Sequence, residues 1–280
     1  MKKKKEKTEK KSNTFFIFTV FILFLALLFV LAKYYYPTGL KVKEYAIINK
    51  KIDKEINGLK IIHLSDIHYK TTVSNNDLTK IAKEVNNYEP DIIIFTGDLF
   101  SKSINYNNDD IEILKEFLSS MDASIAKFAI AGEEDSNNNF ESLITESGFK
   151  SLNNSSDLIF VNSNTPIFIS GIDTNNPDFN KYIENEENIY KILLLHKPDN
   201  VKKLDLSKVD LILAGHSHGG QIRLPFIGPI YNFNGSKIYY NEYYKEENTD
   251  IYISSGIGTS KYYYRFLNKP SINLYRLYND

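Results

Sequence analysis

The sequence predicts an α/β domain that follows one N-terminal transmembrane helix. A long, uncharged apolar run stands near the start of the chain. Short apolar segments typical of strands then alternate with helical patterns through the first half of the chain. The second half is richer in strand patterns, and this order is typical of an α/β domain with packed sheets.

The apolar run extends from Phe15 to Ala32 without a charged residue. As a helix it would be about 27 Å long, close to the hydrocarbon thickness of a bilayer. Tyrosines at 34–36 follow at the depth where aromatic side chains meet the bilayer surface. We therefore expect a basic tail at 1–13, a transmembrane anchor at 14–33, a juxtamembrane linker or strand at 34–56 and a folded domain at 57–280.

The charge distribution predicts the orientation in the membrane. Residues 1–11 contain seven Lys and two Glu, so the tail carries +5 while the whole chain carries −1. A Lys-rich flank stays in the cytoplasm, which predicts a single-pass protein of the cell membrane with an extracytoplasmic domain. The alternative is a signal peptide cleaved after Ala32, with Val30 and Ala32 as the small residues of the cleavage site. The apolar run is longer than the usual core of a signal peptide, which favours the anchor.

Composition excludes cysteine-based sites and argues against a nucleic-acid partner. The chain has no Cys, so it has neither disulfides nor thiolate metal ligands. The residues after the tail carry −6 in total. That balance lacks the basic surface of a nucleic-acid binder, so we expect no stable nucleic-acid partner.

Apolar patterns place the main elements of the domain. Helices are expected before Pro90, with Asn76 or Asp77 as N-cap, and after Asp110, which is the expected N-cap of the second helix. Strands are expected at 60–64, 91–96, 127–131, 158–161, 166–171, 191–195, 210–214, 251–254 and 272–277. The two strands at 158–171 resemble a hairpin.

Five polar clusters come directly after expected strands. They are Asp66-Ile-His68, Gly97-Asp98, the tetrapeptide at 132–135, His196, and the segment at 215–219. Strand ends are where α/β sheets build their sites, because the loops there converge on one edge. His63 lies inside an expected strand and is interpreted as structural.

The residue types in these clusters indicate a pair of metal ions. Asp and His are ligands that Mn, Fe and Zn accept, and two such ions need about seven or eight ligand atoms with one shared carboxylate. Six side chains fit this role: Asp66, His68, Asp98, His196, His216 and His218. Each cluster alone is a weak signal, but the ordered set is specific.

This ordered set resembles the calcineurin-like metallophosphoesterases over residues 59–280. The segment Leu211 to Pro229, together with ISSGIGTS and the later Arg265-Phe266, resembles a branch of small bacterial membrane-associated phosphoesterases. The resemblance implies a sandwich of two β-sheets flanked by helices (α/β/β/α). It also implies a ligand set in which one divalent cation is held by Asp66, His68 and His218, a second by His196 and His216, and both by Asp98.

One motif departs from the family pattern G-N-H-D or G-N-H-E, because this chain has Gly132-Glu133-Glu134-Asp135. By position, Glu133 is expected to replace Asn as a metal ligand. Glu134 replaces His, and a carboxyl group whose pKa is raised by nearby negative charge would act there as a proton donor.

The expected function is metal-dependent hydrolysis of phosphomonoesters or phosphodiesters by a dinuclear centre and a metal-bound hydroxide. His216 is expected to help neutralise charge on the phosphoryl oxygens. The alternative is a catalytically impaired metal-binding module, because the GEED loop replaces the family motif. A nuclease is a further alternative, which the acidic domain disfavours.

Location suggests the substrates: lipid headgroups, cell-wall polymer phosphodiesters or nucleotides outside the membrane. Tyrosines at 239–240, 243–244 and 262–264 form a wall near the site, or reach into lipid headgroups, or are ordinary surface and edge-strand residues.

Overall fold

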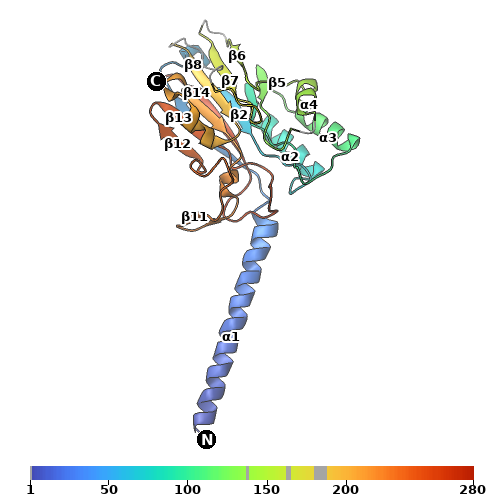
Figure 1. Cartoon of the computed structure of the whole chain (residues 1–280), viewed down its shortest axis with the longest axis vertical. Coiled ribbons are helices and arrows are strands. Elements are labelled where there is room, and N and C mark those ends of the chain that lie inside the picture. The colour runs from blue at the N-terminus through green and yellow to red at the C-terminus, as the bar shows by residue number, and fades with distance from the viewer. Residues whose placement is uncertain (1, 137–138, 162–164, 180–187) are drawn as a thin grey trace.

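The long N-terminal helix stands apart from the rest of the fold. A computed structural model describes residues 2–136, 139–161, 165–179 and 188–280. Helix α1 (Lys2–Val30) continues into a π-helical turn, η1 (Leu31–Tyr35), and projects away from the domain (Figure 1). Within the described residues, one helical segment, Asn13–Tyr35, is long enough and apolar enough to cross a membrane. None of it is buried.

The first sheet has six strands in the order β1-β14-β2-β3-β4-β5. Strands β2 to β5 run parallel, β14 is antiparallel to β2, and β1 is parallel to β14. Their bounds are β1 (Lys41–Ile48), β2 (Leu59–Leu64), β3 (Ile92–Phe95), β4 (Ala126–Ala129), β5 (Lys150–Ser151) and β14 (Ser271–Tyr278). Because β1 pairs with β14 over its whole length, residues 41–48 of the juxtamembrane segment form the edge of this sheet.

The second sheet also has six strands, in the order β12-β13-β9-β8-β7-β6. Its central strands β13, β9, β8 and β7 run parallel, and the edge strands β12 and β6 are antiparallel to their neighbours. The bounds are β6 (Ser155–Ile159), β7 (Ile167–Gly171), β8 (Tyr190–Leu195), β9 (Leu211–Ala214), β12 (Tyr243–Glu246) and β13 (Thr249–Ile253). The expected hairpin is confirmed by the β6–β7 pairing.

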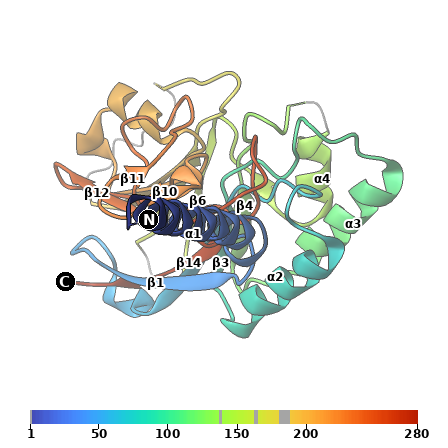
Figure 2. The ribbon, with the colours of Figure 1, turned by 90° about the horizontal axis from the view of Figure 1, so that it is seen from below.

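The two sheets pack face to face, which explains why their strands are apolar on both sides. In β3, Ile92 and Ile94 face the core between the sheets, while Ile93 and Phe95 face the helices. Those helices are α2 (Asn75–Asn87), α3 (Asn108–Ser119) and α4 (Phe140–Glu146), which lie together on one side of the domain (Figures 1 and 2).

The outer face of the second sheet is covered by 3-10 helices. In the described part of the chain these are η3 (Pro198–Lys203) and η4 (Leu206–Lys208), whose Val201 and Leu206 pack against Leu193 and Ile212. A third 3-10 helix, η2 (Lys54–Ile56), precedes β2. The expected sandwich of two sheets flanked by helices is confirmed.

The helix caps differ from those expected. Ser74, not Asn76 or Asp77, is the N-cap of α2, and its hydroxyl and backbone exchange hydrogen bonds with Asp77. Asn107 likewise replaces Asp110 as the cap of α3, with Asp110 accepting from the Asn107 amide at 3.1 Å. In both helices the carboxylate stands at the third helical position, where it completes a capping box.

Candidate metal centre

The polar clusters meet at one edge of the two sheets. Asp66 and His68 follow β2, Asp98 follows β3, and His196 follows β8. His216 and His218 follow β9 and precede or begin the short 3-10 helix η5 (His218–Gly220). The strands that carry them are parallel within each sheet, so their carboxyl ends bring all of these side chains to one place.

Three groups of side chains are close enough to share an ion. In each group the ligand atoms lie within 4.8 Å of one another. The groups are Asp66, His68 and His218; Asp98, His196 and His216; and His68, Asp98 and Glu134. Six of the seven expected metal ligands are therefore placed together, all except Glu133, and Glu134 joins them.

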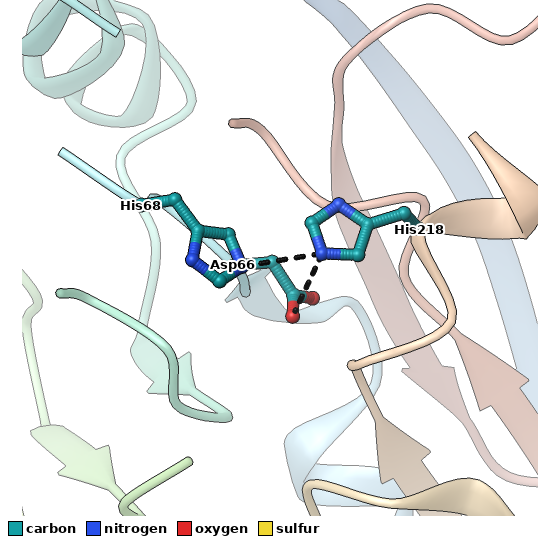
Figure 3. A group of neighbouring side chains, drawn as sticks. All are labelled: Asp66, His68 and His218. Atoms are coloured by element: carbon teal, nitrogen blue, oxygen red, sulfur yellow. Dashed lines mark hydrogen bonds and ion pairs between the residues drawn. The ribbon is translucent and has the colours of Figure 1, made fainter. Parts of the chain in front are cut away.

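The first group is drawn in Figure 3. The Nε2 atoms of His68 and His218 are 3.2 Å apart, and His218 Nε2 lies 3.7 Å from Asp66 Oδ1. All three side chains are buried. Both oxygens of Asp66 also accept the backbone N–H of His216, at 3.1 and 3.0 Å, which ties the loop after β2 to the loop after β9.

Asp98 lies between the first and second groups. Its Oδ2 is 3.1 Å from His196 Nε2 and 3.6 Å from His68 Nε2. The second group is completed by His216, whose Nδ1 is 3.2 Å from His196 Nε2. A carboxylate between two histidine groups has the place that a bridging ligand needs.

Backbone carbonyls orient three of the imidazole rings. The Nδ1 atoms of His68 and His196 contact the carbonyls of Phe100 and Thr96, at 3.1 and 2.7 Å. His216 uses Nε2 instead, 3.0 Å from the carbonyl of Asn234. A carbonyl accepts, so each of these nitrogens carries the proton and the other nitrogen, which faces the centre, is free to bind a cation. The donor set of imidazole nitrogens and carboxylate oxygens therefore fits divalent cations such as Mn, Fe or Zn.

Backbone strain is concentrated in this centre. A positive φ is uncommon outside glycine and is held only where surrounding contacts determine it. Five of the six expected ligands adopt it: Asp66, His68, Asp98, His216 and His218. Gly97 and Gly132 let their loops touch, since a Cβ on Gly132 would lie 2.1 Å from Asp98 Oδ1.

The two glutamates of the GEED loop occupy different places from those expected. Glu133 is paired with Lys197 and lies outside the three groups. Glu134 lies on the Nδ1 side of the His68 ring, with Oε2 3.5 Å from His68 Nδ1 and Oε1 accepting from Ser260 Oγ at 2.9 Å. Burial acts to raise the pKa of Glu134, but the hydrogen bond with His68 and the charge of that ring when it is protonated outweigh burial and lower that pKa to about 2. Glu134 is therefore ionised beside a protonated His68, and its expected role as a proton donor stays a prediction.

The charge of His216 bears on its two expected roles, as a metal ligand and as a group that neutralises charge on the phosphoryl oxygens. Burial and the neighbouring His196 lower the pKa of His216 to about 4. The ring is therefore neutral near pH 7, which suits a metal ligand but gives no positive charge to a phosphoryl group.

Two supporting residues were not predicted. Asp135 accepts the backbone N–H groups of Asp98, Leu99 and Phe100 at 2.8, 2.9 and 3.1 Å, and so fixes the loop that carries Asp98. Arg265 is fully buried, and its Nη2 lies 3.5 Å from Nδ1 of His218. The sequence offered one signal for each: Asp135 ends the GEED motif, and Arg265 belongs to the segment that resembles the bacterial branch.

The sequence model of the calcineurin-like phosphoesterase family matches residues 59–220, which contain every candidate ligand. The chain belongs to this family. Its membership supports a metal-dependent phosphoester hydrolase, and the groups above are able to hold the metals. His63 lies outside the three groups, and its Nε2 is 2.8 Å from the Thr96 hydroxyl.

Several relatives share most of the chain. An uncharacterized metallophosphoesterase of Bacillus subtilis, YkuE, is 32% identical over 254 residues, 88% of each chain. UDP-2,3-diacylglucosamine pyrophosphatase LpxG of Chlamydia trachomatis is 25% identical, over 89% of this chain and 93% of the other. A transmembrane protein with a metallophosphoesterase domain from Danio rerio is 27% identical, over 78% of this chain and 53% of its own length.

Proposed function

We propose that this family member is a membrane-anchored phosphoesterase that works with two divalent cations. One cation would be held by Asp66, His68 and His218, and the second by His196 and His216, with Asp98 shared. The observation that carries the proposal is the position of Asp98, whose Oδ2 lies within 3.6 Å of a histidine of each group.

When bound, the two cations would supply Lewis acidity and lower the pKa of a water molecule. The chain's own residues then have separate tasks. The carbonyls of Thr96, Phe100 and Asn234 keep the protons of three imidazoles away from the centre. Glu134, as an ionised carboxylate beside His68, is suited to accept a proton or to orient a water molecule, and not to protonate a leaving group.

The impaired metal-binding module stays the second candidate, and one observation favours it. Glu134 adds a carboxylate to the group of His68 and Asp98, which weakens the attraction of the centre for an anionic phosphoester. The burial of six ligands in mutually oriented positions favours the enzyme, because a degenerate site has no need to retain strained backbone at five of them.

The position of the protein in the cell is a further part of the proposal. Helix α1 would cross the membrane once, with the Lys-rich tail in the cytoplasm and the domain outside. Protease added to intact cells should then cut the domain. A domain that is cleaved only after the cells are opened would contradict this orientation, and a soluble mature form that begins at Lys33 would support the cleaved signal peptide.

Substrates at that location include lipid headgroups, cell-wall polymer phosphodiesters and nucleotides. One relative, LpxG, is named for an activity on a diacylated nucleotide sugar, which supports an amphiphilic phosphoester as a candidate. The test is elemental analysis of the purified full chain together with a panel of these phosphoesters. About two equivalents of Mn, Fe or Zn with metal-dependent turnover support the proposal, whereas bound metal without turnover on any substrate supports the impaired module.

A further inference from the structure

The small hairpin after η5 exposes a group of large apolar side chains. Strand β10 (Arg223–Leu224) pairs with β11 (Gly228–Pro229), and the turn between them carries Phe226 and Ile227. Phe226 is fully exposed, Ile227 is 74% exposed, and Ile230 just beyond β11 is 61% exposed. A cluster of this kind on a surface marks a contact with something apolar.

The hairpin is held beside the outer end of helix α1. Its residue Arg223 donates its backbone N–H to the carbonyl of Phe266 at 2.9 Å, and the Phe266 ring lies 5.0 Å from the ring of Tyr36. The residue before Phe266 contacts the end of the helix directly, because the backbone N–H of Arg265 donates to the carbonyl of Ala32 at 3.0 Å. Both views of the molecule show β10–β11 next to this end of α1 (Figures 1 and 2).

Exposed aromatic residues lie at the same level. Tyr34 and Tyr35, at the end of the apolar helix, are 62% and 54% exposed, and Tyr262 and Tyr263 in the neighbouring segment are 44% and 43% exposed. Tyrosines of this kind are typical of the depth where a protein leaves the hydrocarbon and enters the headgroup layer. The hairpin tip is therefore apolar where the anchor indicates a bilayer surface.

We propose that the β10–β11 hairpin is a second membrane contact, with Phe226 and Ile227 inserted into the bilayer that α1 crosses. The bilayer is favoured over a protein partner because the hairpin is joined by backbone hydrogen bonds to the segment that packs on the end of the span. The domain would then meet the membrane at two points, the chain connection to α1 and the hairpin. Two points fix the orientation of the domain relative to the membrane surface.

That orientation places the metal centre toward the lipid headgroups. Tyr231 follows the hairpin, and its ring lies 5.3 Å from Phe233, whose ring is 5.4 Å from His218 and 6.1 Å from His216. An aromatic surface thus leads from the hairpin to the candidate ligands. If the proposed hydrolase function holds, the substrate class is a phosphoester on an amphiphile embedded in the bilayer, with its apolar part along this surface.

The docking is testable without reference to activity, because the chain has no Trp. Phe226→Trp places a sole indole at the hairpin tip of the full chain, reconstituted in phosphatidylcholine–phosphatidylglycerol vesicles. The matched control is Phe160→Trp, since Phe160 is 61% exposed and is the residue after β6. Strand β6 lies on the side of the domain far from α1 (Figure 1).

Brominated phospholipids should quench the indole emission of the Phe226→Trp variant at least about two-fold and leave that of the Phe160→Trp variant unchanged. Equal quenching in the two variants would overturn the docking. So would an emission from the Phe226→Trp variant that responds to protein concentration and not to bromolipid, because the hairpin would then contact a second copy of the chain.

The substrate class is tested with the double variant Phe226→Ser with Ile227→Ser. Two substrates with one leaving group are compared: phosphatidyl-p-nitrophenol in vesicles and bis-p-nitrophenyl phosphate in water. Turnover of the lipid should fall about ten-fold, because the hairpin no longer holds the centre at the surface, while turnover of the soluble diester stays the same. An equal loss on both substrates would contradict the assignment. If the unmodified chain hydrolyses neither, the hydrolase proposal fails, and the quenching experiment still decides the docking.

Discussion

Arg265 connects the end of the apolar helix to the candidate metal centre. Its backbone N–H donates to the carbonyl of Ala32 at 3.0 Å, and its Nη2 lies 3.5 Å from Nδ1 of His218. The same Nη2 donates to the carbonyls of Ser255 and Gly256, at 2.9 and 3.1 Å. One buried side chain thus fixes the loop after β13 and the ring of a candidate ligand beside the end of the apolar helix.

Arg265→Met should destabilise the domain by about 3 kcal/mol, because buried carbonyls lose a charged donor. It should also lower the metal content, since His218 loses a neighbour that fixes its ring. The measurements are the denaturation midpoint in one detergent and elemental analysis. The matched control is Arg276→Met, where Arg276 is 3.5 Å from Glu44 in an exposed pair of little energetic value. Similar losses in the two variants would show that Arg265 does not connect these parts.

Substitution of the two glutamates of the GEED loop should have different effects on metal affinity. Glu134→Ala removes a carboxylate that lies with His68 and Asp98, so the affinity for the cation they share should fall about ten-fold or more. Glu133→Ala removes only the partner of Lys197 and should leave the metal content close to that of the unmodified chain. Titration of the metal-depleted protein measures both. A larger loss for Glu133→Ala would show that Glu133 turns inward when the cation binds, as its position in the motif predicts.

Asp98→Asn tests the shared ligand. An amide in place of the carboxylate between the two histidine groups should remove metal from both and abolish detectable phosphoesterase turnover, a loss of at least a few kcal/mol in transition-state stabilisation. Asp110→Asn is the matched control, since Asp110 is also buried but completes the capping box of α3 and pairs with Lys70 at 2.5 Å. It should cost about 1 kcal/mol of stability and retain the metal. Full metal content in Asp98→Asn would contradict the bridging role.

The sequence predicts the candidate ligands well because they follow directly after buried strands. Strand ends fix the place of Asp66, Asp98 and His196 within a residue or two, and parallel strands then bring them together. The direction in which a loop side chain points cannot be predicted in this way. Glu133 and Glu134 are neighbours in the sequence, and only the backbone path from Gly132 to Asp135 decides which of them faces His68.

Contacts between segments that are distant in the chain also could not be predicted from the sequence. Nothing in residues 41–48 indicates that they pair with β14 at the far end of the chain, since the pairing depends on how the whole sheet is assembled. The sequence also does not reveal that Phe226 lies near the end of the apolar helix, because Arg265 and Phe266 join the two segments through backbone hydrogen bonds that any residue type can make.

His63 gives a prediction about the pH dependence of stability. The Thr96 hydroxyl donates to Ser65 Oγ at 2.9 Å, so it accepts from His63 Nε2 at 2.8 Å, and a neutral ring satisfies this arrangement. Burial lowers the pKa of His63 to about 3. The unfolded chain takes up this proton near pH 6.5, whereas the folded chain does not, so the contribution of His63 is present above pH 6.5 and is lost as pH falls toward 3.

The expected slope from this one group is about 1.4 kcal/mol per pH unit between those limits. In His63→Gln the amide can still donate to Thr96 but does not titrate, so the variant should lose less stability on acidification. Urea denaturation of the metal-depleted proteins at about pH 7.5, 6 and 5 measures the difference, which should narrow as pH falls and be constant above about pH 7. Both proteins keep every candidate ligand, so the acid sensitivity of the metal centre is common to both and cancels. Parallel curves over the whole range would show that His63 has the same pKa in the folded and the unfolded chain, so that burial in β2 does not keep the ring neutral.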